Sequence, residues 1–402
     1  MSAARVIVIG GGASGLAAAI AAAEGGASVT VLESAAKPGR KLLATGNGRC
    51  NLMNTGTPVY FGGKALAERV TGSGAGRLNA FFDGLGLVTA EEDCGRVYPA
   101  CGQASAVLEV LMYALHRLRV KVICGVRVKE LLREKDGFLV RCEGEDHRAD
   151  RVILCCGGMA GLHLGHDGSA YSLLTRLGHT LVPPRPALCP IETDKPPVQG
   201  LKGLRCPVRL LLTRTGHVVD ASRGEALFTE YGISGVCAMQ LSARAEKGML
   251  LYADFSPLLF PEERGFDHGV STRDGVGSGK DRCAALLKER SGRLGWDGVP
   301  VGLLPELLRK KLSGIPEDRL AELLTAYPMR VMGTRGFDQA QVTRGGWDTG
   351  EFDPDTLESR IVPGCYACGE ALDVDGDCGG FNLQFAFLSG ITAGWHAAGS
   401  GA

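Results

Sequence analysis

A glycine-rich turn near the start of the chain limits the fold to a few architectures. The run Arg5–Ile9 before it is apolar and β-branched, as is typical of a strand buried on both faces of a parallel sheet. The turn itself is Gly10–Gly15, and the alanine-rich stretch Leu16–Ala23 after it favours a helix. A second strand is expected at Ser28–Leu32. This order predicts the first βαβ unit of a Rossmann-type fold.

The residue types of this turn suit a dinucleotide. Gly10 permits the tight turn, Gly12 lets the backbone approach a pyrophosphate, and Gly15 lets the helix pack close to the strand. The free N–H groups at the helix start then face the phosphates. Glu33 follows Gly15 by 18 positions, close to the expected place of the carboxylate that binds the ribose hydroxyls. The predicted contacts are Gly10, Gly12, Ala13, Ser14, Gly15 and Glu33.

The next segment, residues 37–51, is basic and rich in turns, where an NAD-binding unit would continue into a helix. Positive side chains and glycine backbone along this path suit a pyrophosphate and the edge of a flavin ring. A solvated surface loop is the alternative. The candidates for cofactor binding here are Arg40, Lys41, Gly48, Arg49, Cys50 and Asn51.

A second glycine turn precedes a helix near the C-terminus. A strand is expected at Gly364–Cys368, and Gly379 and Gly380 introduce an apolar helix at Phe381–Ala398. Backbone amides at this helix start are again free to approach a ligand. The aspartates at 373, 375 and 377 resemble the start of a calcium loop, but position twelve of that loop is Gln384 instead of glutamate. No metal site is therefore predicted.

Longer motifs carry a resemblance that covers nearly the whole chain. The segment GRKLLATGNGRCN (residues 39–51) after a Rossmann start resembles the BaiN/YhiN-like family of FAD-dependent oxidoreductases. Further matching segments are GRVYP (95–99), CGG (156–158), HDGSAY (166–171), LGH (177–179), GEALFTEYGISG (224–235) and the long C-terminal motif at 364–382. The chain departs from the family pattern at Asn47, Tyr98, Cys365, Cys368 and Cys378.

The resemblance implies FAD as the cofactor and two-electron hydride transfer through flavin N5. NADH or NADPH is the implied donor, with a conjugated enone or a small amine as the organic substrate. It adds Gly157 and the C-terminal residues to the cofactor site, with Glu370 or Asp373 beside the ribityl or phosphate region. The C-terminal set is Gly369, Glu370, Asp373, Gly379, Gly380, Phe381 and Asn382.

The pattern of short runs predicts an α/β fold of two domains. Alternating runs between residues 120 and 155, with a hairpin signal at Asp136-Gly137, indicate a β-meander returning to a central strand. The prolines at 183, 184 and 186 mark a boundary. We therefore expect a Rossmann-type, glutathione-reductase-like FAD domain at 1–186 and 336–402. The inserted cap, 187–335, is expected to be β-barrel-like at 187–261 and mainly helical at 262–328.

Composition restricts the partners. The chain has 402 residues, with 44 lysines and arginines against 44 aspartates and glutamates. This balance argues against nucleic acid or an anionic membrane as a partner and leaves a small-molecule substrate. No apolar run approaches the ~20 residues that span a bilayer. Fourteen cysteines without a compact disulfide framework favour the cytoplasm. Nothing in the sequence predicts an oligomeric state.

The sequence offers only isolated candidates for catalysis. They are Cys50, Tyr98, His166 and Tyr231, and none has an evident catalytic partner. Burial in a strand is the favoured interpretation of the Cys365/Cys368 pair and of the adjacent Cys155 and Cys156. Two other functions stay open: an FAD-dependent RNA-modifying or regulatory flavoprotein, and an NAD-binding module without FAD.

Overall fold

A computed structural model describes residues 3–72, 74–165, 167–264, 267–268 and 275–399. The chain divides into two compact units, Met1–Arg185 with Gln341–Ala402, and Pro186–Ala340. The boundaries expected after residues 186 and 335 lie one and five residues from these divisions. The predicted His166 lies outside the described residues.

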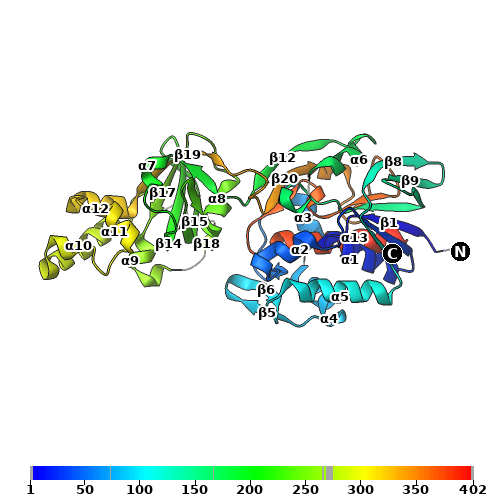
Figure 1. Ribbon diagram of the computed structural model, residues 1–402, viewed down its shortest axis with the longest axis horizontal. Coiled ribbons are helices and arrows are strands. Elements are labelled where there is room, and N and C mark those ends of the chain that lie inside the picture. The colour runs from blue at the N-terminus through cyan, green and yellow to red at the C-terminus, as the bar shows by residue number, and fades with distance from the viewer. Residues whose placement is uncertain (1–2, 73, 166, 265–266, 269–274, 400–402) are drawn as a thin grey trace. The chain divides into compact units, whose positions relative to one another are not determined.

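The first unit contains most of the helices and strands labelled in Figure 1. Its elements are β1 (Arg5–Ile9), α1 (Ala13–Glu24), β2 (Ser28–Glu33), α2 (Arg40–Ala44), β3 (Met53–Asn54), β4 (Tyr60–Gly62), α3 (Lys64–Thr71), α4 (Gly74–Gly84), β5 (Thr89–Glu92), β6 (Arg96–Pro99), α5 (Ala104–Arg117), β7 (Lys121–Cys124), β8 (Val128–Glu134), β9 (Gly137–Cys142), β10 (His147–Ala149), β11 (Arg151–Leu154), α6 (Ser172–Thr175), β12 (Leu181–Ala187), β20 (Val342–Trp347), β21 (Cys365–Ala367), β22 (Val374–Gly376) and α13 (Phe381–Ala398).

A five-stranded parallel sheet forms the centre of the first unit. Its strand order is β21-β11-β1-β2-β7, so β21, from near the C-terminal end, lies beside strands from the first half of the chain. Val6, Val8 and Ile9 of β1 are buried, as the apolar run predicts. Helices α1 and α13 pack against each other closely, since a Cβ added at Gly390 would lie 2.2 Å from the carbonyl oxygen of Ser14. The Rossmann-type prediction is confirmed.

Two local expectations in this unit are wrong. The run at 120–124 is β7 of the central sheet, while the antiparallel meander consists of β8, β9 and the unpredicted β10. The proline segment 183–186, expected to interrupt regular structure, lies within β12, which pairs with β20 in a two-stranded sheet. Proline is tolerated there because such a strand has an unpaired edge that needs no N–H donor.

The second unit is built on a closed barrel. Its elements are β13 (Ile191–Thr193), α7 (Lys195–Val198), β14 (Arg205–Arg214), β15 (His217–Phe228), β16 (Gly232–Ser234), α8 (Val236–Ser242), β17 (Leu250–Asp254), α9 (Ser256–Leu259), β18 (Asp267–His268), α10 (Lys280–Leu294), α11 (Glu306–Lys311), α12 (Glu317–Thr325) and β19 (Tyr327–Thr334). Six antiparallel strands close in the order β14-β17-β19-β13-β16-β15, because β15 pairs again with β14. Val208, Leu210 and Leu212 alternate into its core. The predicted barrel is confirmed, and it is completed by β19, which follows the helices.

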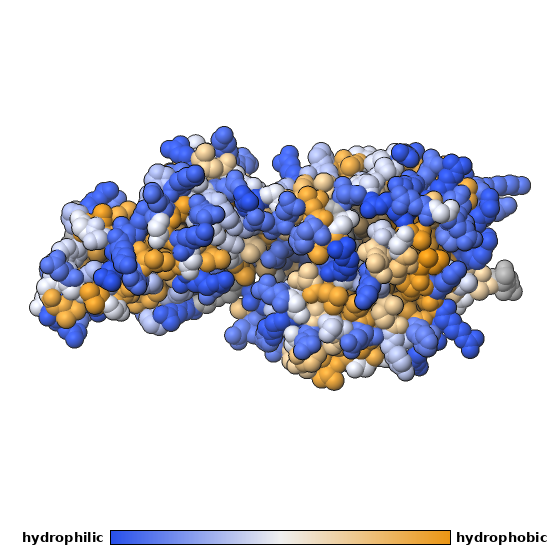
Figure 2. Space-filling model, viewed as in Figure 1, coloured by the Kyte–Doolittle hydropathy of each residue, from blue (hydrophilic) through white to orange (hydrophobic). Residues whose placement is uncertain are grey.

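The surface agrees with the balanced composition. On the face drawn in Figure 2, hydrophilic residues cover much of the area and apolar residues form smaller patches between them. Among the described residues, no helix combines the length and the apolar character needed to cross a bilayer.

Candidate functional site

The first glycine turn has the geometry that the motif requires. Gly10 has φ +109°, and a Cβ there would lie 2.3 Å from the carbonyl oxygen of Cys155. A Cβ at Gly15 would lie 1.9 Å from the carbonyl oxygen of Gly10. A Cβ at Gly12, in contrast, would meet nothing within 4 Å among the described residues. Gly10 and Gly15 therefore serve the fold, whereas Gly12 leaves free space at the start of α1.

The start of α1 is prepared for an anion. Gly12 is its N-cap, no side chain in the described part of the chain caps the helix, and its first turn holds no acidic residue. The N–H groups of this turn thus keep their attraction for negative charge. Glu33, at the end of β2, is held beside the turn, since its carboxylate accepts hydrogen bonds from the N–H of Gly11 (2.7 Å) and of Ala35 (2.6 Å).

The C-terminal motif meets this turn. A Cβ at Gly369 would lie 2.5 Å from Ser14 Oγ, and the Gly369 N–H donates to Ser389 Oγ at 2.9 Å. Gly369 follows β21, and Ser389 belongs to α13. Residues predicted from the two ends of the chain are thus in contact at the edge where the parallel strands end.

Glu370 is the centre of a small polar network. Its Oε2 accepts from Lys41 Nζ at 2.5 Å, and its Oε1 accepts from the N–H of Thr343 at 2.7 Å. Thr343 Oγ1 accepts in turn from the N–H groups of Met159 (2.7 Å) and Ala160 (2.9 Å). Lys41 and Thr343 therefore meet at one carboxylate, and Thr343 links it to the segment at 159–160.

Thr343 was not predicted from the sequence. It is a lone hydroxyl in β20 without a recognisable motif, and only the tertiary contact reveals its role. Gly158 shows how tightly it fits, because a Cβ there would lie 2.4 Å from Thr343 Oγ1. The neighbouring Gly157 has φ +69°, in the left-handed region that glycine favours.

The aspartate-rich segment that resembles the start of a calcium loop forms strand β22, paired with β4. Asp375 is buried and accepts hydrogen bonds from the Arg344 guanidinium at 2.9 and 3.1 Å. Burial raises the pKa of Asp375, and Arg344 opposes that shift. Asp373 Oδ1 accepts from the N–H of Gly345 at 3.0 Å. Among the described residues, no group of three or more histidine, cysteine, aspartate or glutamate side chains is arranged to hold a metal ion.

The segment 45–51 has a strained backbone. Gly46 and Asn47 have φ of +57° and +56°, and Cys50 has φ +59°. A Cβ at Gly380 would lie 2.8 Å from Asn51 Oδ1, so the segment meets the second glycine turn. Asn51 Oδ1 is buried and has no hydrogen-bond partner among the described residues.

Other predicted cofactor residues differ in their surroundings. The Asn382 side chain bonds the backbone of Gly376 through both its oxygen (2.8 Å) and its nitrogen (2.7 Å), so it fixes the turn before α13. The Phe381 carbonyl accepts from the Tyr60 hydroxyl at 3.2 Å. Arg40 and Gly48 are exposed, and Gly379 is buried.

Residues missed by the sequence analysis also support this turn. Asn54 Nδ2 donates to the Gly379 carbonyl at 2.9 Å, and the Asn54 N–H donates to Gln384 Oε1 at 3.1 Å. Arg344, which bonds Asp375, is another residue near this turn that was not predicted from the sequence. Isolated amide and guanidinium side chains give no sequence signal that would distinguish them from surface residues.

The catalytic candidates are not equivalent. Cys50 is fully buried, and burial raises the pKa of its thiol to about 12, against the effect of a hydrogen bond with Thr45. It therefore has neither the exposure nor the low pKa that a reactive thiol requires. Tyr231 belongs to the second unit, where Arg335 lies 4.8 Å from the centre of its ring.

Tyr98 lies near the strained segment. Its ring is 3.7 Å from the position of a Cβ at Gly46, and the Arg49 guanidinium lies 4.2 Å from the ring centre. The Arg49 guanidinium also donates two hydrogen bonds to the Glu92 carboxylate, one of them 3.1 Å long. Burial raises the pKa of Tyr98, and the charges of Arg96 and Arg49 oppose this.

The cysteines expected in strands are buried or partly buried. Cys155 and Cys368 follow the neighbouring strands β11 and β21, and their Sγ atoms lie 3.1 Å apart as free thiols. Cys365 is fully buried.

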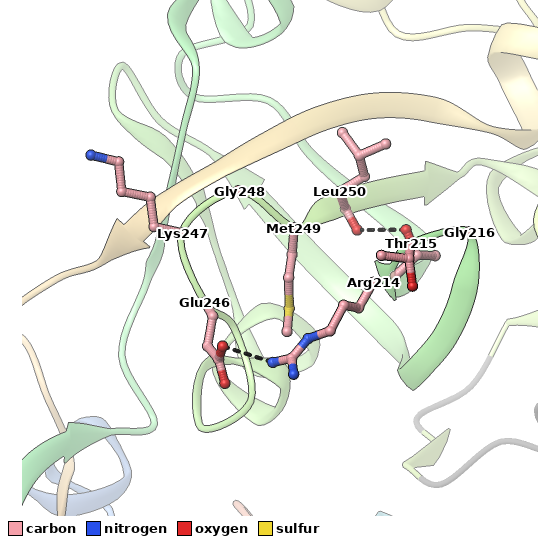
Figure 3. A pocket seen from close by; sticks show the side chains of 9 residues that line it. Arg214, Thr215, Gly216, Glu246, Lys247, Gly248, Met249 and Leu250 are labelled. Carbon is pink, nitrogen blue, oxygen red and sulfur yellow. Dashed lines mark hydrogen bonds and ion pairs between the residues drawn. The ribbon is translucent and has the colours of Figure 1, made fainter.

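A cavity of about 470 Å³ lies in the second unit, lined by residues 213–216 and 246–250. Figure 3 shows Arg214 and Glu246 pointing toward one another there, with an ion pair of 2.7 Å. None of the predicted site residues that the structure describes lines this cavity.

The residues of the first unit fit FAD. The free space at Gly12, the uncapped start of α1 and the partnerless Asn51 Oδ1 are features that a dinucleotide with a polar ring system would use. The N–H groups of α1 would hold the diphosphate, Glu33 the ribose, and Asn51 a polar edge of the cofactor.

Known proteins resemble this chain over nearly its full length. The model of the HI0933-like protein Rossmann domain matches residues 4–396. A 3-dehydro-bile acid delta(4,6)-reductase of Clostridium scindens is 40% identical, covering 98% of this chain and 99% of the reductase. A ribosomal RNA dihydrouridine synthase of Escherichia coli is 27% identical, covering 95% of each chain.

A solved structure supports the fold. A flavocytochrome c3 fumarate reductase in an open conformation has a TM-score of 0.53 at 14% identity, covering 98% of this chain and 78% of that one. The family resemblance inferred from the motifs is confirmed by these matches. The chain belongs to the HI0933-like family of Rossmann-type, FAD-binding oxidoreductases.

Proposed function

We propose that this protein is an NAD(P)H-dependent reductase of a carbon–carbon double bond conjugated with a carbonyl group in a small molecule. The observation that carries the proposal is the 40% identity, over essentially the full length of both chains, to the 3-dehydro-bile acid delta(4,6)-reductase. A 3-oxo group next to a 4,6-diene is a conjugated dienone, the kind of acceptor that takes hydride at the carbon remote from its carbonyl.

The second relative supports the same bond chemistry on another substrate. A dihydrouridine synthase saturates the ring double bond of uridine, which is also conjugated with a carbonyl. Two relatives with different substrates thus share one reaction class, and neither name implies amine oxidation. We therefore favour the enone over the amine among the substrates that the sequence suggested.

The protein supplies binding, orientation and a proton, and bound FAD supplies the hydride chemistry. The uncapped start of α1 and Glu33 bind the adenosine diphosphate half of the cofactor. The bonds of Glu370 to Lys41 and Thr343 hold three segments of the chain together beside the cofactor. Tyr98 is our candidate proton donor to the carbon next to the carbonyl, because its ring lies beside the segment 45–51 and a phenol is protonated at neutral pH.

Ribosomal RNA is the second candidate substrate, on the strength of the Escherichia coli relative. The equal numbers of basic and acidic residues count against it, since RNA-binding proteins usually carry a basic excess. Both candidates predict FAD reduction by a nicotinamide and differ only in the oxidising substrate.

A two-step anaerobic experiment tests the proposal. The yellow holoenzyme is first mixed with NADH or NADPH, and the flavin absorbance is followed until it bleaches. The reduced enzyme is then mixed separately with a 4-en-3-one steroid, simple cyclic enones and ribosomal RNA. We expect an enone to restore the absorbance rapidly and to yield the saturated ketone. Recovery with RNA alone, with dihydrouridine formed, would replace the small-molecule assignment. Failure of both nicotinamides together with bleaching by amines would reject the reductase.

A further inference from the structure

Tyr171 carries a buried hydroxyl that lacks a partner. The residue is 5% exposed, and its Oη has no hydrogen-bond partner among the residues that the structure describes. A buried hydroxyl left unpaired costs about 1–3 kcal/mol, so such groups are uncommon in folded proteins. Tyr171 ends the motif HDGSAY (166–171) but is not one of the predicted site residues.

The ring of Tyr171 is fixed in place by Trp347. The two rings pack edge to face, with centres 5.7 Å apart and planes at 84°. Trp347 Nε1 also donates to the Tyr171 carbonyl at 3.2 Å, and the Trp347 carbonyl accepts from the N–H of Asp373 at 3.0 Å. Trp347 is itself fully buried. The phenol is therefore held rigidly and linked to the segment that carries the predicted cofactor residues.

The phenol is connected to the cofactor residues through Trp347, whose carbonyl accepts from the N–H of Asp373 and whose strand, β20, also carries Thr343. Burial raises the pKa of Tyr171, and the carboxylates of Glu370 and Asp373 raise it further. The nearby carboxylates already have donors: Glu370 binds Lys41 and Thr343, and Asp373 binds the N–H of Gly345. The phenol is thus a protonated donor among acceptors that are bound to other groups.

A matched tyrosine shows the contrast. Tyr366 of β21 is 3% exposed, and its hydroxyl donates to the His396 carbonyl at 3.4 Å. The two phenols are buried to the same degree in the same unit, and only the Tyr171 hydroxyl lacks an acceptor. An acceptor supplied by a ligand explains why a tyrosine, instead of phenylalanine, stands at position 171.

We infer that the Tyr171 hydroxyl donates a hydrogen bond to an oxygen atom in the ribityl–diphosphate part of bound FAD. Trp347, on which the phenol packs, belongs to the same strand as Thr343, and Thr343 bonds Glu370, which follows β21 at the edge where α1 begins. In a Rossmann-type sheet this edge binds the diphosphate. Tyr171 would then be a cofactor-binding residue, and the inference does not depend on which substrate the enzyme reduces.

Removal of the single hydroxyl tests this inference. Tyr171→Phe and the control Tyr366→Phe are made in the full-length protein, and the FAD is removed from both and from the wild type. The Kd of FAD is measured by quenching of flavin fluorescence, and the Tm is measured without cofactor. For Tyr171→Phe we expect a Kd about tenfold higher, an FAD-free Tm no lower than that of the wild type, and an unchanged visible spectrum of bound flavin. For Tyr366→Phe we expect a lower Tm and an unchanged Kd.

Three outcomes would overturn the inference. An unchanged Kd for Tyr171→Phe would show that the hydroxyl does not contact FAD. A fall in its FAD-free Tm as large as that of Tyr366→Phe would show that the hydroxyl already has a partner in the protein. A shifted flavin spectrum would place the contact at the ring system instead of the ribityl–diphosphate part. All of these readouts are independent of turnover, so a failure of the proposed reductase activity would not affect them.

Discussion

The ammonium group of Lys41 and the carboxylate of Glu370 lie 2.5 Å apart, although their positions in the chain differ by 329. Their side chains are only 21% and 19% exposed. Water therefore screens this pair less than an exposed one, and the pair joins the segment after β2 to the segment after β21. An ion pair of this kind secures one side of the cofactor site.

Glu370→Gln should destabilise the first unit. The amide can still accept from the N–H of Thr343, but Lys41 loses its countercharge while remaining mostly buried. We expect a loss of about 1–3 kcal/mol in the free energy of unfolding, measured by urea denaturation. Lys129–Glu143 is a matched control with the same 2.5 Å distance and side chains 54% and 55% exposed. Glu143→Gln should cost under about 1 kcal/mol, and an equal loss in both variants would contradict the role assigned to burial.

Alanine at two glycines of the first turn should separate folding from cofactor binding. Gly12→Ala meets open space, so the FAD-free protein should keep its Tm, while the methyl group occupies the room for the diphosphate. We expect FAD affinity to fall at least about tenfold. Gly15→Ala would place a Cβ 1.9 Å from the Gly10 carbonyl oxygen, so its Tm should fall by several degrees. Normal FAD binding by Gly12→Ala would refute the assignment of this turn.

His179 should make stability depend on pH. Its Nδ1 lies 2.8 Å from Glu351 Oε2 and its Nε2 lies 2.8 Å from Ser359 Oγ. Burial lowers the pKa of His179, and Glu351 opposes the shift. In the unfolded chain, His179 is therefore protonated below pH ~6.5, whereas in the folded protein it stays neutral to a lower pH. The contribution of His179 to the free energy of unfolding is thus present above pH ~6.5 and is lost as the pH falls.

His179→Gln tests this dependence. The variant should lose about 2 kcal/mol in the free energy of unfolding at pH ~8, where the neutral imidazole keeps both contacts, and less at pH ~5.5. Urea denaturation of both proteins at the two pH values measures the difference. A loss of the same size at both pH values would show that protonation of His179 does not affect stability.

Tyr98→Phe should slow one half of the catalytic cycle. Bleaching of the flavin by NAD(P)H requires no proton from this residue and should stay unchanged. Reoxidation by the enone should slow by about 10²-fold, because the carbon next to the carbonyl loses its proton donor. Stopped-flow absorbance resolves both halves. Equal slowing of both would indicate a structural effect of the substitution instead of proton transfer.

Local sequence patterns predicted the elements that depend on local chemistry. The helix expected at Phe381–Ala398 is α13 with the same bounds, because two glycines define its start and apolar residues continue to its end. The first strand, Arg5–Ile9, also agrees at both ends. Gly10 and Gly15 were recognised because backbone closeness permits only glycine there.

Elements that depend on distant partners were not predictable in this way. The acidic run around Asp375 looks like a solvated loop, yet Arg344 neutralises that carboxylate from 31 residues away and β4 pairs with the backbone. Thr343 has no motif of its own, and its role arises from contacts with Met159 and Ala160. Residue type alone does not encode these partnerships.

The close packing of α1 on α13, with Gly390 against Ser14, has a consequence for synthesis in the cell. Residues 186–340 leave the ribosome as one contiguous stretch and can fold while translation continues. The Rossmann sheet still lacks β21 at that stage, and α1 still exposes the face that α13 covers. The part of the site that joins the two ends of the chain can therefore form only after α13 has been synthesised, when residues 186–340 are already complete.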